Sequence, residues 1–135
     1  MSKEFKFEII SNDGKRFTSD IVEALIKAPK GILGILKGHA PLVSFLDITT
    51  FQIIYSDGSK EFFATSGALL NVSPEKLTII CDNFETRDEI DKDRVIKSRD
   101  YAYELLKHLS AENCEEVAKA QRHLNKALNR LSLLD

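Results

Sequence analysis

The 135-residue sequence has no long apolar segment, and its charge is nearly balanced. Its longest apolar run falls well short of the roughly 18 to 20 residues that a membrane-spanning helix needs, so we expect no direct membrane insertion. A net charge of −2 carries no electrostatic sign of a nucleic-acid partner or of an anionic membrane. The first residues have neither the apolar core of a signal peptide nor the arginines of a transit peptide. We therefore expect a protein of the cytosolic compartment.

Two cysteines and three histidines are few and scattered. Cys81 and Cys114 form no Cys-x-x-Cys pair and no cluster with histidine, so we expect free thiols and no metal site. No serine or cysteine stands in a context typical of a nucleophile with its base. The glycines of residues 31–38 do not lead into Gly-Lys-Ser/Thr or into a helix, which excludes a phosphate loop. We therefore expect a protein that is not an enzyme.

The first 84 residues show the patterns of a β-protein. Phe5, Phe7 and Ile9 alternate with charged residues, which is the period of a half-buried strand. Turn signals separate the further strands that we expect at residues 21–28, 49–55, 60–65, 69–72 and 77–81. Many short strands at even spacing predict a β-sandwich or flattened β-barrel over residues 1–84.

The remaining residues, 85–135, predict an α-helical hairpin, because glycine and proline are absent after residue 88. Asp88 or Asp91 can cap a first helix that ends near Leu109. Either Ser110 caps the second helix or the link ends near Asn113. Apolar residues recur at helical spacing, with small residues where the helices can approach: Val95, Ala102, Leu105, Leu106, Leu109, Val117, Ala120, Leu124, Ala127, Leu128 and Leu131.

Residues 31–42 form an apolar block with three glycines that ends in an Ala-Pro pair. Glycine is needed where φ is positive or where another backbone comes close, and proline holds the preceding residue extended. We expect a shaped loop that includes Gly38 and presents Ala40, Pro41 and Leu42 to a partner. His39 either hydrogen-bonds the backbone of this loop or contacts the partner directly.

This block resembles the Gly-x-Leu-Gly-x-x-Pro-Gly-His-x-Pro-Leu signature of the epsilon subunit of F-type ATP synthases. The resemblance extends from about residue 5 to 134, with Ile32 at a usually acidic position and Lys37 in place of proline. Residues 66–72 are similar to the family's Ser-Gly-Gly-x-x-x-Val, and residues 126–131 also match.

The resemblance implies a non-catalytic rotor subunit at the cytoplasmic face of the bacterial plasma membrane. Its sandwich would bind the gamma subunit, and the loop of residues 38–42 would meet the membrane c-ring. The subunit would thereby couple proton or sodium flow to ATP synthesis.

The resemblance further implies a hairpin that folds down on the sandwich or extends along gamma towards the catalytic alpha and beta subunits, where it inhibits ATP hydrolysis. From the residues alone, a hairpin fixed on the sandwich is the simpler interpretation, because elements with two packings are rare.

Residues 90–95 resemble the Ile/Leu-Asp-x-x-Arg-Ala motif with which some bacterial epsilon subunits bind ATP. The resemblance implies a regulatory ATP site, not a required cofactor, formed by Glu85, Ile90, Asp91, Arg94, Lys126 and Arg130. The three cations can neutralise a triphosphate. Val95 replaces a smaller alanine, and Lys126 replaces an arginine and lacks its bidentate geometry. The alternative is a solvated helix face with i,i+4 ion pairs.

Two other functions remain open. A free-standing ATP-sensing β-sandwich module would need the same hairpin site but no gamma subunit. An adaptor that binds peptides by strand addition gives no reason for the block of residues 31–42.

Overall fold

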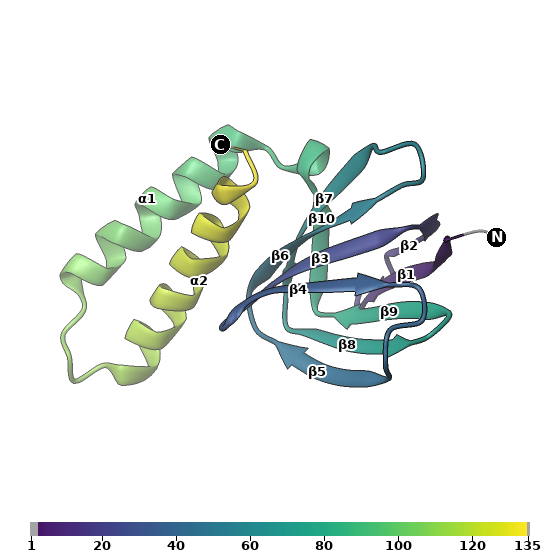
Figure 1. The fold of residues 1–135 in the computed structure, drawn as a ribbon. Coiled ribbons are helices and arrows are strands. Elements are labelled where there is room, and N and C mark those ends of the chain that lie inside the picture. The colour runs from purple at the N-terminus through teal and green to yellow at the C-terminus, as the bar shows by residue number, and fades with distance from the viewer. Residues whose placement is uncertain (1–2, 135) are drawn as a thin grey trace.

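The computed structural model describes residues 3–134, which form a two-sheet β-sandwich with a helical hairpin beside it (Figure 1). One sheet has the strand order β2-β1-β9-β8-β5, and the other has the order β10-β7-β6-β3-β4. The strands are β1 (Phe5–Ser11), β2 (Arg16–Ile21), β3 (Glu23–Ala28), β4 (Gly31–Leu36), β5 (Leu42–Leu46), β6 (Thr49–Ile54), β7 (Lys60–Ser66), β8 (Ala68–Ser73), β9 (Lys76–Cys81) and β10 (Asn83–Thr86). The predicted fold class is confirmed.

Apolar side chains from both sheets fill the space between them. Phe5, Phe7 and Ile9 are all buried, as their alternation predicts. The rings of Phe51 and Phe63 stack at 4.8 Å between centroids, and the ring of Phe7 lies 5.9 Å from each of them. This aromatic cluster joins β1 of one sheet to β6 and β7 of the other. The core of the sandwich therefore lies within residues 5–84.

The strand expected at residues 21–28 is wrong in its first part. Ile21 ends β2, and β3 begins at Glu23 in the other sheet. Val22 lies between them and donates its backbone N–H to the carbonyl of Ile54 at 2.8 Å. The chain therefore passes from one sheet to the other at a single residue, without the glycine or proline that usually marks such a change in sequence.

The block of residues 31–42 is only in part a loop. Residues 31–36 form β4, an edge strand paired with β3. Gly38 has a positive φ of 85°, and its N–H donates to the Pro74 carbonyl at 2.8 Å. Ala40 and Pro41 are exposed as expected, but Leu42 begins β5 and is half-buried against the core. The expected loop is therefore limited to residues 37–41.

The hairpin consists of α1 (Lys92–His108) and α2 (Cys114–Ser132), preceded by the short 3₁₀ helix η1 (Arg87–Glu89). Asp91 caps α1, because its carboxylate accepts the backbone N–H of Arg94 at 3.2 Å. Asp88, the other expected cap, lies in η1. The link ends at Asn113, which precedes α2. Within residues 3–134, neither helix is long and apolar enough to span a bilayer.

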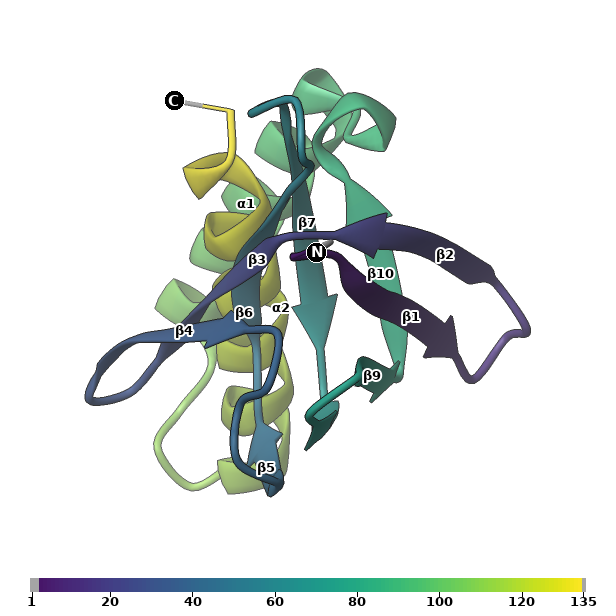
Figure 2. The same ribbon diagram turned by 45° about the vertical axis from the view of Figure 1, so that its right-hand side comes forward.

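A small second core attaches the hairpin to the sandwich. Ile90, Val95, Ala127 and Leu131 pack together with Ala64 of β7. The helix α2 lies next to the sheet, and α1 packs on its outer side (Figures 1 and 2). Leu128, expected on the buried face, is 41% exposed. The neighbouring Ala127 faces inward in its place, which lets α2 approach β7 closely.

Candidate functional site

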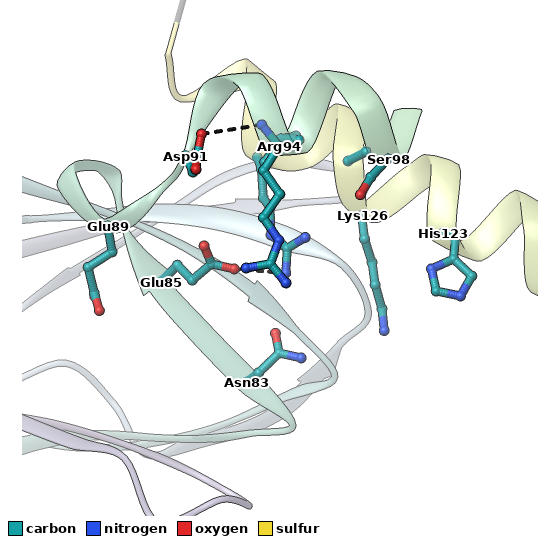
Figure 3. Close-up of a pocket in the computed structure, with 11 residues that line it drawn as sticks. Asn83, Glu85, Glu89, Asp91, Arg94, Ser98, His123 and Lys126 are labelled. Carbon is teal, nitrogen blue, oxygen red and sulfur yellow. Dashed lines mark hydrogen bonds and ion pairs between the residues drawn. The ribbon is translucent and has the colours of Figure 1, made fainter. Parts of the chain in front are cut away.

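A cavity of about 450 Å³ opens between α1, α2 and β10 (Figure 3). Its volume lies in the range of small-molecule sites. The lining residues are Asn83, Glu85, Glu89, Asp91, Arg94, Val95, Ser98, His123, Lys126, Ala127 and Arg130. The site therefore combines the end of the sheet with one face of each helix.

Five of the six residues expected in an ATP site line this cavity: Glu85, Asp91, Arg94, Lys126 and Arg130. The sixth, Ile90, is not among the lining residues. Its side chain is buried in the small core under the hairpin. The folded hairpin thus brings together residues that are up to 45 positions apart in the sequence, from Glu85 to Arg130.

Arg130 and Glu85 form an ion pair at 2.7 Å, and each side chain is 29% exposed. The pair connects α2 to β10 at the wall of the cavity. An anion that binds Arg130 must therefore compete with Glu85, or share the guanidinium, which has five N–H donors.

The other two carboxylates of the cavity are also engaged. Asp91 caps α1, and Glu89 accepts a hydrogen bond from Lys15 Nζ at 2.7 Å. The bond from Lys15, followed by that from the Thr86 backbone, holds the pKa of Glu89 below its ordinary value. No ion pair involves the side chains of Arg94 or Lys126 within the part of the chain that the structure describes. These two cations are available to an anionic ligand.

Four polar lining residues were not expected from the sequence: Asn83, Glu89, Ser98 and His123. The spacing contained a signal for two of them. Ser98 lies four residues after Arg94, and His123 lies three before Lys126, so each shares a helix face with an expected residue. Figure 3 shows His123 and Lys126 projecting from α2 to the same side.

Val95 lines the cavity and also belongs to the small core, with 5% of its surface exposed. Its side chain therefore forms a fixed part of the wall. The arrangement as a whole offers cations and hydrogen-bond acceptors around an open space, which suits a polyanion with a polar attached group.

A second candidate surface lies on the outer face of the sheet that contains β1. Phe45, Leu69 and Ile80 are paired neighbours on β5, β8 and β9. Their side chains are 67%, 37% and 45% exposed, and Val43 nearby on β5 is 68% exposed. We call these four residues the apolar row. A contiguous exposed apolar surface of this kind is typical of a protein–protein interface.

The loop of residues 37–41 joins β4 to β5 and holds its shape through its own backbone contacts. Nδ1 of His39 lies 2.8 Å from the Ala40 carbonyl, and the His39 N–H donates to the Leu36 carbonyl at 3.1 Å. The imidazole thus makes the first of the two contacts that the sequence left open. Ala40 and Pro41 remain exposed beside it.

Comparison with known proteins covers the whole described chain. Residues 4–87 match the family model of the ATP synthase delta/epsilon chain β-sandwich domain, and residues 88–135 match that of its long α-helix domain. The ATP synthase epsilon chain of Bacillus pumilus is 37% identical over 97% of both chains. That of Clostridium kluyveri is 31% identical over 99% of both.

A solved structure shows the same fold. A chain of the Euglena gracilis mitochondrial ATP synthase, in a structure of its OSCP, F1 and c-ring, superposes with a TM-score of 0.85 at 17% identity, covering 100% of this chain and 84% of that one. Two family models that together span residues 4–135, and relatives matched over nearly their full length, give one conclusion: the chain belongs to the ATP synthase epsilon chain family.

Proposed function

We propose that this chain is a non-catalytic rotor subunit of an ATP synthase, and that the apolar row is its docking surface for the gamma subunit. The observation that carries this proposal is the exposure of Phe45, Leu69 and Ile80 as direct neighbours across three strands. A soluble sheet usually presents polar residues on its open face. The family relationship supplies the partner that would cover these side chains.

The loop of residues 37–41 would face the membrane c-ring of the same complex. Its backbone contacts hold Ala40 and Pro41 in an exposed turn at one end of the sandwich. Lys37 adds a positive charge next to this turn. In this position the chain would lie at the cytoplasmic face of the plasma membrane and couple ion flow, of protons or sodium, to ATP synthesis.

The hairpin would act as a brake on ATP hydrolysis that ATP itself releases. In the folded position, α2 is held by the small core and by three polar contacts with the sandwich. These are Arg130–Glu85 at 2.7 Å, Arg122–Asp47 at 2.9 Å and the bond from Asn129 to the Thr49 carbonyl at 2.9 Å. Few contacts hold the hairpin, so an extended state that reaches the alpha and beta subunits is energetically accessible.

ATP in the cavity would favour the folded hairpin, because the site exists only when α1, α2 and β10 are together. At a concentration 100-fold above the dissociation constant, a ligand stabilises the state that binds it by about 2.7 kcal/mol. A shift of this size changes the dominant conformation of a two-state element whose states differ by a few kcal/mol.

Co-purification of the full chain with the gamma subunit of its own organism tests the rotor function. We expect a stable complex under native conditions. Failure of the two chains to associate would contradict the proposal.

A second candidate function is a free-standing ATP sensor, which the cavity alone favours. Calorimetry with ATP and co-purification with gamma separate the two functions. ATP binding without gamma binding would support the sensor, whereas gamma binding without ATP binding would leave a rotor subunit with a ligand-independent hairpin.

A further inference from the structure

We propose that protonation of His123 strengthens the binding of ATP phosphates in the cavity, so that the ATP response of the hairpin depends on pH. This inference rests on the proposed ATP site and adds a regulatory group to it. His123 lines the cavity together with the expected residues but was not among them.

The protonation state of His123 determines whether the cavity lining carries a net formal charge. Three carboxylates line it, and three cations balance them; the six are Glu85, Glu89, Asp91, Arg94, Lys126 and Arg130. With a neutral imidazole the lining carries no net charge. A protonated His123 makes it positive, which favours a polyanion. Histidine is the side chain whose ordinary titration range falls between about pH 5 and 8.

The position of His123 brings it close to the place where phosphates would bind. It lies one helical turn before Lys126 on α2, and residues at this spacing have Cβ atoms roughly 5–6 Å apart. Both side chains project to the same side, away from the Asp91 cap (Figure 3). A phosphate oxygen held by Lys126 is therefore within reach of an N–H from the imidazole, and a charged donor makes the stronger bond.

The groups around His123 determine the direction of the effect. The titratable and charged neighbours are Lys119 and Lys126 on α2, Arg94 and Tyr101 on α1, Glu85 on β10, Glu89 in η1, and the α1 cap Asp91. The carboxylates among them are engaged with Arg130, Lys15 and the α1 backbone. The nearest positions on α2 are basic, so a triphosphate bound beside Lys126 would meet positive charge along this helix. A protonated imidazole attracts the triphosphate more strongly than a neutral one, so ATP and proton binding reinforce each other reciprocally.

Isothermal titration of the full chain with ATP at about pH 6 and pH 8 tests the inference. The variants are His123→Ala, which removes the titrating group, and His123→Lys, which keeps a positive charge at both pH values. His108→Ala is the matched control, because His108 is an exposed helix histidine that does not line the cavity. The terminal phosphate of ATP also titrates in this range, but it does so equally for all four proteins.

We expect the affinity of the original chain at pH 6, relative to that of His123→Ala, to be about two- to fivefold higher, the scale of an exposed ion pair. The two should agree at pH 8. The original chain should also take up protons on binding ATP, measured as a dependence of the binding heat on the ionisation heat of the buffer. His123→Ala should show less uptake, His108→Ala should behave like the original chain, and His123→Lys should bind tightly at both pH values.

If the affinity for ATP depended on pH equally in the original chain and in His123→Ala, with equal proton uptake, the role of His123 would be overturned. The proposal of an ATP site would not be affected by that result. Absence of ATP binding at both pH values would overturn the ATP site, and the role of His123 with it. The two failures are therefore distinguishable.

Discussion

The Arg130 guanidinium lies 2.7 Å from the Glu85 carboxylate, and this contact connects the last turns of α2 to the strand β10. The same guanidinium lines the cavity. One side chain therefore takes part both in holding the hairpin down and in the proposed ligand site. Because both partners are partly exposed, the pair itself contributes about 1 kcal/mol or less.

Replacing Arg130 with alanine should lower the affinity for ATP by about 10-fold or more, since a hydrogen bond to a charged group contributes about 1.5–3 kcal/mol. Titration calorimetry measures the change. Arg99→Ala is the control, because Arg99 lies on α1 outside the cavity and pairs with Asp100. Equal affinities of the two variants would remove Arg130 from the site.

Replacing Phe45 with aspartate should weaken the complex with gamma by at least about 10-fold, because burial of a large apolar side chain contributes about 1.5–3 kcal/mol. Surface plasmon resonance with immobilised gamma gives the dissociation constant. Tyr101→Asp is the matched control, because Tyr101 is similarly exposed at 70% but lies on α1. If Phe45→Asp bound gamma as tightly as the control, the apolar row would not be the interface.

Replacing Gly67 with alanine should destabilise the sandwich by about 1–2 kcal/mol, the cost of a left-handed conformation for a residue with a Cβ. Gly67 has a φ of 61°, and its added Cβ would meet the carboxylate of Asp82. Gly34→Ala is the contrasting variant, because its Cβ would lie an ordinary 3.6 Å from Leu25. Urea unfolding should show a lower free energy of unfolding for Gly67→Ala. For Gly34→Ala the free energy of unfolding should change little or rise slightly.

The stability of the sandwich should depend on pH through Glu8. This carboxylate is buried on the face of the sheet, and a hydrogen bond from Lys76, together with contacts from Arg16, holds its pKa below the ordinary value of 4.5. A carboxylate whose pKa is lower in the folded state than in the unfolded state stabilises the fold at any pH above its unfolded-state pKa. That stability is lost as the pH falls through its folded-state pKa.

Glu8→Gln should therefore be less stable than the original chain at pH 7, and the difference should narrow as the pH falls below 4.5. Thermal unfolding of both proteins at several pH values measures the stability difference at pH 7 and its change with pH. A difference that stays constant down to pH 3 would show that the charge of Glu8 is not its cause.

Much of the fold was predictable because the spacing of the apolar residues and the positions of the turn residues indicated the same strands. The alternation of Phe5, Phe7 and Ile9 predicted β1. Turn signals between the expected strands at 49–55 and 60–65, and between those at 69–72 and 77–81, agree with the antiparallel pairs β6–β7 and β8–β9. The strand β2 was missed because it lies at a sheet edge and its alternation is broken, with the polar Ser19 between Phe17 and Ile21 at the inward positions. Residues 31–36 were misassigned because their glycines suggested a loop, although Gly34 has no special conformation.

Only the site residues that belong to recognisable motifs were predictable from the sequence. The resemblance grouped Glu85, Arg94 and Arg130, which the hairpin does bring to one cavity. His123 and Asn83 line the cavity only because α2 lies against β10. This is a tertiary contact, and the helical period alone does not specify it. Ile90 belongs to the same motif but serves packing, because adjacent residues at a helix start point in different directions.

We propose that the hairpin restrains hydrolysis, whereas the sandwich alone binds the rotor. The sandwich core lies within residues 5–84, so a chain that ends at residue 87 should still assemble.

The most direct test is the ATP hydrolysis rate of the purified complex with the intact chain and with this truncated chain, each with and without an ATP-regenerating system. We expect faster hydrolysis in the truncated complex, with the largest difference when ATP is low and the hairpin is extended. Equal rates in both complexes under both conditions would contradict it.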